Sequence, residues 1–182
     1  ADSPIKITSQ LKDNYWKGIY VNKSSKNDVY STLNHVKISN FTYFDNKFIQ
    51  LTGGLNFINS NVKLTNSFVE KSYAEDAINL VNSNFIISDL DIKNSKSDGI
   101  DVDFGEGKIS RSSFNNIVGD AIDLSGSKIS IDQVNIKNIG DKAISVGENT
   151  QLEVTNAIIS YSRIGIASKD ASNVMGSNIN IS

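Results

Sequence analysis

The sequence contains no cysteine, and its 182 residues include one proline, one histidine and one tryptophan. Without cysteine, no disulfide, thiolate metal site or thiol nucleophile is possible. The single histidine, His35, excludes a metal site built from several histidines. Neither a serine in a nucleophile-elbow context nor a phosphate-binding glycine loop is present. These absences remove most of the common catalytic signatures.

Charge and hydropathy argue against two further kinds of partner. Eighteen basic and 20 acidic residues give a formal net charge of −2, so no basic field favours nucleic acid. The apolar runs are too short to cross a membrane, and we expect no membrane insertion. Residues 4–8 and 179–181 alternate like strands, so we expect residues 1–182 to form one domain that is part of a larger chain.

The dominant feature of the sequence is a repeat in which an isoleucine follows a small residue. Its clearest positions are 22 residues apart: Ile78, Ile100, Ile122, Ile144 and Ile166. Extending the series upstream gives Ile49 and Ile19, at gaps of 29 and 30 residues, with Phe48 as the exception to the small-residue rule. A fixed period of this length predicts one supersecondary unit stacked on itself.

Two more apolar series follow the same period and predict two more strands in each unit. One series contains Phe85/Ile87, Ile109, Ile129/Ile131 and Leu152/Val154; the other contains Ile92, Phe114, Ile136 and Ile158. Two residues after the second series stand Asn94, Asn116, Asn138 and then Ser160, which predicts a stacked asparagine ladder at a turn. Three strands per unit, stacked about 4.8 Å apart, predict an all-β parallel β-helix. Since 22 is not a multiple of six, we expect the right-handed form, with about seven coils of roughly 22 residues.

These coils, the Gly/Ala-Ile strands and the asparagine ladder resemble the right-handed parallel β-helix repeat proteins of the pectin-lyase-like superfamily. Residues 3–9, 16–19, 140–148 and 165–170 are similar to segments of bacterial surface β-helix proteins. The resemblance covers essentially the whole chain. It implies a β-solenoid module of a secreted or cell-surface bacterial protein.

The sharpest candidate for a site is a patch of carboxylates. Asp76, Asp98 and Asp120 share one column of the repeat, and Asp101 and Asp123 share another. Carboxylates about 4.8 Å apart on neighbouring coils raise one another's pKa unless they are paired. One interpretation is structural: the side chains accept backbone N–H bonds or pair with lysine and arginine.

Two functional interpretations of the patch remain open beside the structural one. Asp101, Asp103 and Glu106, in the loop D-V-D-F-G-E-G, are candidate Ca²⁺ ligands, because this ion prefers clustered oxygen ligands. Alternatively, Asp98, Asp120, Asp101 and Asp123 are candidate catalytic residues, a general acid and base acting on a glycosidic bond.

The catalytic interpretation also has a family resemblance behind it. Polygalacturonases, which share this fold, carry Asn-Thr-Asp-Gly-Ile-Asp and then Gly-Asp-Asp-Cys-Ile. Residues 97–101 and 118–122 are similar, with Asp98 and Asp120 at the matching aspartates. However, Gly119 replaces the first aspartate of the family's pair, no Gly-His-Gly follows, and the Arg-Ile at 163–164 lacks the family's lysine. The resemblance therefore speaks for the fold more than for the activity.

Aromatic residues crowd the first part of the chain, and exposed rings can stack on sugar faces. Trp16, Tyr20 and Tyr43 are the candidate ligand-binding residues. We expect a non-catalytic extracellular scaffold module that binds polysaccharide along the acidic or the aromatic surface. The alternative is a polysaccharide-degrading or -modifying enzyme. Flanking domains or like chains are candidate partners at the two ends, because strand edges invite β-addition.

Overall fold

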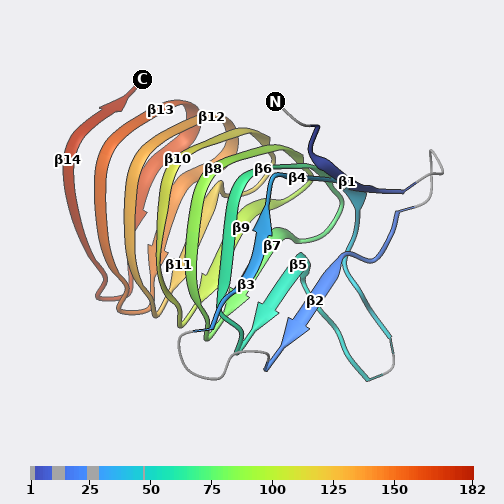
Figure 1. Cartoon of the computed structure of the whole chain (residues 1–182). Coiled ribbons are helices and arrows are strands. Elements are labelled where there is room, and N and C mark those ends of the chain that lie inside the picture. Colours follow the sequence, from blue (N-terminus) through green and yellow to red (C-terminus); the bar gives the residue numbers. More distant parts are fainter. Residues whose placement is uncertain (1–2, 10–14, 24–28, 47) are drawn as a thin grey trace.

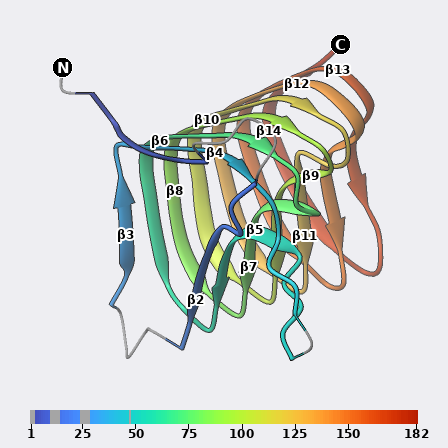
Figure 2. The same cartoon turned by 90° about the vertical axis from the view of Figure 1, so that its right-hand side faces the viewer.

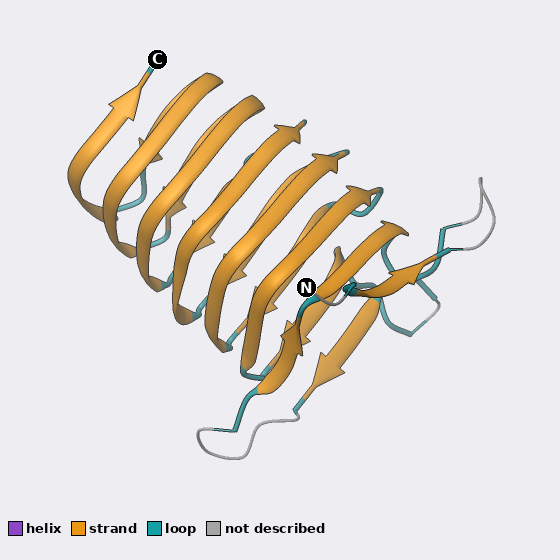
Figure 3. Cartoon of the chain, turned by 45° about the horizontal axis from the view of Figure 1, so that its top comes forward, coloured by secondary structure: helices purple, strands orange, loops and turns teal. Residues whose placement is uncertain are grey.

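The computed structural model describes residues 3–9, 15–23, 29–46 and 48–182, and these residues form strands, turns and loops without a helix (Figure 3). No helix in those ranges could therefore carry the chain across a bilayer. In chain order the strands are β1 (Ile5–Thr8), β2 (Ile19–Asn22), β3 (Ser31–Asn34), β4 (Val36–Phe41), β5 (Gly53–Ile58), β6 (Val62–Ser72), β7 (Asp76–Val81), β8 (Asn84–Ser95), β9 (Asp98–Asp103), β10 (Glu106–Ile117), β11 (Ile122–Ser125), β12 (Lys128–Gly147), β13 (Gln151–Ser168) and β14 (Asn173–Ile181).

The strands wind into a parallel β-solenoid whose coils lie side by side from the N-terminal to the C-terminal end (Figure 1). Long bent strands stack in the order β4-β6-β8-β10-β12, and short strands stack in the order β2-β5-β7-β9-β11. Both β12 and β13 continue round the coil from the long into the short position. The predicted all-β parallel β-helix is confirmed, with about six coils of about 22 residues.

Three columns of left-handed residues form the corners of the coils. In the coil built around β10 these residues are Phe104, Arg111 and Asn116, each with φ near +50°. The next coil repeats the corners at Gly126, Gln133 and Asn138. Asparagine tolerates this conformation better than most residues, which explains why it recurs there.

The corners divide each coil into three faces. We call the stretch from the Phe104 corner to the Arg111 corner the first face, the stretch from Arg111 to Asn116 the second, and the stretch from Asn116 to Gly126 the third. The equivalent stretches of the other coils carry the same names.

The predicted isoleucine column lies inside the solenoid. Ile78, Ile100, Ile122, Ile144 and Ile166 pair in register on successive coils. All but Ile166 are fully buried. The column forms because the parallel register places the same repeat position of each coil directly above its predecessor.

The upstream end of that column was predicted incorrectly. Leu55, not Ile49, pairs with both Ile78 and Ile19. Ile49 is 40 % exposed and lies where residues 42–46 and 48–52 project from the coils (Figure 2). Gly54 precedes Leu55, so the small-residue rule holds in this coil after all; a Cβ on Gly54 would overlap the ring of Phe41. Ile49 therefore belongs to a loop within this coil, and Leu55 takes the core position that Ile49 was expected to fill.

The downstream end contains a second error, caused by a shift of one residue. Glu148 and Asn149 both adopt positive φ, and this longer turn places Ile159 rather than Ile158 beside Ile136. Ile158 consequently points outward and is 54 % exposed. The spacing between paired residues of β12 and β13 returns to 22 residues at an irregularity between Ile139 and Lys142. A β-bulge has this effect on register.

Side-chain ladders reinforce the corners inside and outside. Outside, Asn116 Nδ2 donates to Asn94 Oδ1 at 3.2 Å and Asn138 Nδ2 donates to Asn116 Oδ1 at 3.2 Å, which confirms the predicted asparagine ladder. Inside, the Ser127 hydroxyl accepts the Gly105 N–H at 3.0 Å and donates to the Ser125 carbonyl at 2.8 Å. Such hydroxyls satisfy buried backbone N–H groups beside the corners.

Replacing Ser127 by alanine tests the inner ladder. The substitution leaves the buried N–H of Gly105 without an acceptor, which we expect to cost about 1–3 kcal/mol of unfolding free energy. The melting temperature should fall by several degrees in a thermal melt followed by circular dichroism. Ser130→Ala, on the outer side of the same coil, is the control and should change little. Equal losses in both variants would contradict a special role for the inner hydroxyl.

Candidate functional site

The predicted aspartates gather on the third face, on β7, β9 and β11, with Asp120 in the segment that leads into β11. The parallel register places Asp76 beside Asp98. A second row on the same face runs Asn79–Asp101–Asp123–Ser145. We use the name acidic patch for the set Asp76, Asn79, Asp98, Asp101, Asp103 and Asp123.

Asp98 and Asp120 act as clamps between coils. Oδ1 of Asp98 accepts the N–H of Asp120 at 2.8 Å, and Oδ1 of Asp120 accepts the N–H of Lys142 at 2.8 Å. The Lys142 ammonium then lies 3.0 Å from Oδ2 of Asp120 and 2.7 Å from Oδ2 of Asp141. These contacts match the structural interpretation of the two aspartates.

Gly119 belongs to the same arrangement. A Cβ at this position would overlap Oδ1 of Asp98, so only glycine lets that carboxylate reach the backbone of the next coil. The departure from the polygalacturonase pattern at Gly119 and the Asp98 clamp are thus one structural feature.

Burial and neighbouring charges raise the pKa values of four aspartates of the patch. Burial, followed by repulsion from Asp76, Asp103 and Asp123, raises the pKa of Asp101 to about 8. Burial is also the main cause that raises the pKa of Asp76 to about 7 and that of Asp98 to about 6. The pKa of Asp103 is raised by burial and then by Glu148 and Asp123. At neutral pH Asp101 is therefore mostly protonated and Asp76 about half protonated.

The structure does not bring the three predicted Ca²⁺ ligands together. Asp101 and Asp103 share the third face, but Glu106 follows the Phe104 corner on the first face. There its carboxylate lies 3.5 Å from the Lys128 ammonium. Within the described residues, no three histidine, cysteine, aspartate or glutamate side chains are arranged to hold one metal ion.

The three predicted aromatic ligand-binding residues occupy different environments. The Trp16 indole donates to the Ser39 carbonyl at 2.9 Å and packs edge-on against Phe41, so it covers the N-terminal end of the core. Tyr20 is exposed on β2 and pairs in register with Asn56. Asn56 in turn pairs with Asn79, so Tyr20 stands at the N-terminal end of the row that contains Asn79. Tyr43 is exposed in the loop that follows β4.

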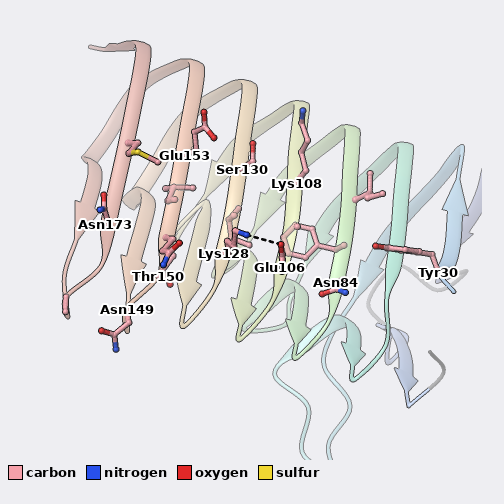
Figure 4. Close-up of a pocket in the computed structure, with 18 residues that line it drawn as sticks. Tyr30, Asn84, Glu106, Lys108, Lys128, Ser130, Asn149, Thr150, Glu153 and Asn173 are labelled. Atoms are coloured by element: carbon pink, nitrogen blue, oxygen red, sulfur yellow. Dashed lines mark ion pairs between the residues drawn. The ribbon is translucent and has the colours of Figure 1, made fainter. Parts of the chain in front are cut away.

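A long groove on the first face was not predicted from the sequence. It has a volume of about 920 Å³ and crosses β8, β10, β12, β13 and β14, with Tyr30 at one end and Asn173 toward the other (Figure 4). Two rows of outward side chains line it: Asn84, Glu106, Lys128, Gln151 and Asn173, and Ile86, Lys108, Ser130, Glu153 and Met175. Applying the 22-residue period to these polar positions would have shown the rows, because they follow the same register as the core.

Comparisons with protein-family models, with curated proteins and with solved structures found no match for this chain. The parallel β-solenoid itself is therefore the part of the family resemblance that is shown.

The acidic patch makes the stability of the protein depend on pH. Asp76 and Asp101 have pKa values in the folded chain, about 7 and about 8, above the ordinary value of 3.8. Such groups favour folding fully below pH 4, and the benefit disappears as pH rises through 7 and 8. We expect the melting temperature to fall by at least a few degrees between pH 5 and pH 9.

The variant Asp101→Asn should flatten this dependence and raise the melting temperature at pH 9. Asp132→Asn is the matched control. The pKa of Asp132 is lowered, so this aspartate affects stability only below about pH 4. A melting temperature that stays level or rises from pH 5 to pH 9 would show that the patch is not buried as described.

Proposed function

We propose that this chain is a non-catalytic β-solenoid scaffold, a module of an extracellular or cell-surface bacterial protein, and that it binds polysaccharide in the groove of the first face. The observation that carries the proposal is the groove itself, which runs over successive strands and presents outward side chains, most of them polar, on each. Residues stack about 4.8 Å apart along such a face, so a linear polymer meets a repeating set of contacts.

The chemistry of the lining suits a sugar polymer. Asn84, Gln151 and Asn173 offer amide donors and acceptors, and Ser130 adds a hydroxyl. The Glu106–Lys128 ion pair keeps this part of the groove electrically balanced. Tyr30 presents an aromatic ring, whose apolar face can pack against the C–H side of a pyranose. The surface location is supported by the sequence resemblance to bacterial surface β-helix proteins.

Binding to a panel of bacterial polysaccharides, measured by affinity electrophoresis or pull-down, tests the proposal. We expect Tyr30→Ala to weaken binding by about five- to tenfold, because one aromatic contact contributes about 1 kcal/mol. Tyr161→Ala removes a tyrosine that is more exposed and lies outside the groove, and it should bind like the parent chain. Equal effects of both substitutions, or no binding to any polysaccharide, would contradict the groove as the site.

One observation favours a second candidate, a polysaccharide-degrading or -modifying enzyme that uses the acidic patch. The pKa of Asp101, about 8 through burial, leaves this carboxyl protonated at neutral pH, which is the state required of a general acid. Asp123 lies directly beside it on the next coil.

The scaffold proposal predicts that the chain does not cleave the polysaccharides of the same panel. Cleavage is measured as the release of reducing ends or of unsaturated products. If cleavage is found, Asp101→Asn should abolish it while Tyr30→Ala leaves residual turnover. The double variant Asp98→Asn/Asp120→Asn should leave sugar binding intact. Activity lost in the Asp variants would replace the scaffold by the enzyme.

A further inference from the structure

Three buried polar atoms on the third face have no hydrogen-bond partner among the described residues: Oδ2 of Asp76, Oδ1 of Asn79 and Oγ of Ser145. Asp76 is only 3 % exposed and Asn79 only 7 %. An unsatisfied buried polar atom destabilises a fold by about 1–3 kcal/mol, and native proteins rarely leave several together. Asp76 and Asn79 both lie on β7, whereas Ser145 lies three coils further along the row. The pair on β7 indicates an occupant that supplies hydrogen-bond donors.

The unsatisfied acceptors of Asp76 and Asn79 border the other aspartates of the acidic patch. Asn79 is the register neighbour of Asp101, and Asp76 is the register neighbour of Asp98. Asp76, Asp98, Asp103 and Asp123 all repel the Asp101 carboxylate, and no lysine or arginine is among the groups that shift its pKa. Further charges near the patch come from Glu75, which repels Asp76, and Glu148, which repels Asp103.

The lysine whose charge acts on Asp98 is already engaged. The Lys142 ammonium is held between Asp120 and Asp141. It weakly favours the charged form of Asp98, and it is not among the groups that act on Asp76 or Asp101. The patch therefore combines excess negative charge, unsatisfied acceptors and no counter-ion from the described part of the chain.

We propose that the acidic patch binds a primary ammonium group, with Oδ2 of Asp76, Oδ1 of Asn79 and the Asp101 carboxylate as its three acceptors. An ammonium group carries three N–H donors and no acceptor, and its hydrogen bonds to carboxylates are the strong, charge-assisted kind. Asp98 and Asp101 are partly exposed, and Asp98 is the register neighbour of the buried Asp76, so a ligand would approach Asp76 past these two side chains. This site lies on a different face from the polysaccharide groove and does not depend on it.

The geometry favours an ammonium group over a metal ion. Ca²⁺ needs six to eight oxygens at about 2.3–2.6 Å, and no three acidic side chains of the described residues converge in that way. Hydrogen bonds from nitrogen reach about 2.8 Å and need only acceptors that face the donor.

The row of acids also suggests the form of the ligand. Asp123 follows Asp101 one coil later, about 4.8 Å along the solenoid axis. A second ammonium group on a short linear chain would meet this carboxylate. A linear diamine is therefore the best simple probe.

The test is isothermal titration calorimetry of the full chain with 1,4-diaminobutane at pH 8. Choline chloride at the same ionic strength is the control ligand, because its quaternary ammonium has equal charge per nitrogen but no N–H donor. We expect saturable binding of the diamine and none of choline. Asp76→Asn and Asp101→Asn should each weaken binding at least tenfold, whereas Asp132→Asn on another face should bind like the parent chain.

The competing occupants give different results. If a proton on Asp76 or Asp101 is the sole occupant, the diamine gives no saturable heat at pH 8, and the proposal fails. Equal responses to diamine and choline would reduce the effect to charge screening and also overturn it. Saturable Ca²⁺ binding without diamine binding would replace the ammonium group by a metal ion. A melting curve for each variant shows whether it folds. The comparison of diamine with choline uses the parent chain, so it remains valid even if a variant fails to fold.

Discussion

The parallel hydrogen-bond ladder between successive coils is the interaction on which the rest of this structure depends. It fixes the same repeat position of each coil above its predecessor, so one choice of residue becomes a column through the molecule. Inward columns become the core, as Ile100, Ile122 and Ile144 do. Outward columns become continuous surfaces, of one chemical character in the acidic patch and of mixed polar character in the groove. The left-handed corners interrupt the ladder, and stacked asparagine amides and inner hydroxyls replace the bonds that the corners remove.

This dependence explains what the sequence could and could not predict. The core columns were visible because burial forces isoleucine, valine or leucine into them at every turn. The errors occurred where the coil length changed: Ile49 matched the pattern of residue types, but Leu55 holds the register. Likewise, one extra residue at the Glu148 turn moved Ile158 out of the core. A period read from sequence assumes a constant coil length, and the backbone adjusts that length with loops and bulges.

The functional surfaces were harder to predict for a different reason. Outward positions have no burial requirement, so groove residues such as Lys108 and Glu153 vary freely in type and give no periodic signal of residue type. The acidic columns were visible, but their roles depend on contacts that the sequence does not contain. Asp98 has a backbone N–H within reach because Gly119 leaves the space, whereas Asp101, three residues later, faces other carboxylates.

That contrast separates structural aspartates from candidate functional ones. A carboxylate that accepts a backbone N–H from the next coil stabilises the solenoid, and its presence needs no further explanation. Asp76 and Asp101 have the opposite balance: burial and neighbouring charges oppose their ionised forms, which weakens folding as pH rises. Asparagine would fit the Asp101 position without that penalty, as Asn79 and Asn56 show in the same row one and two coils away. Groups that destabilise the fold and make no compensating structural contact concentrate at functional sites. The aspartates that accept no backbone N–H from the next coil are therefore the ones whose chemistry is most worth testing.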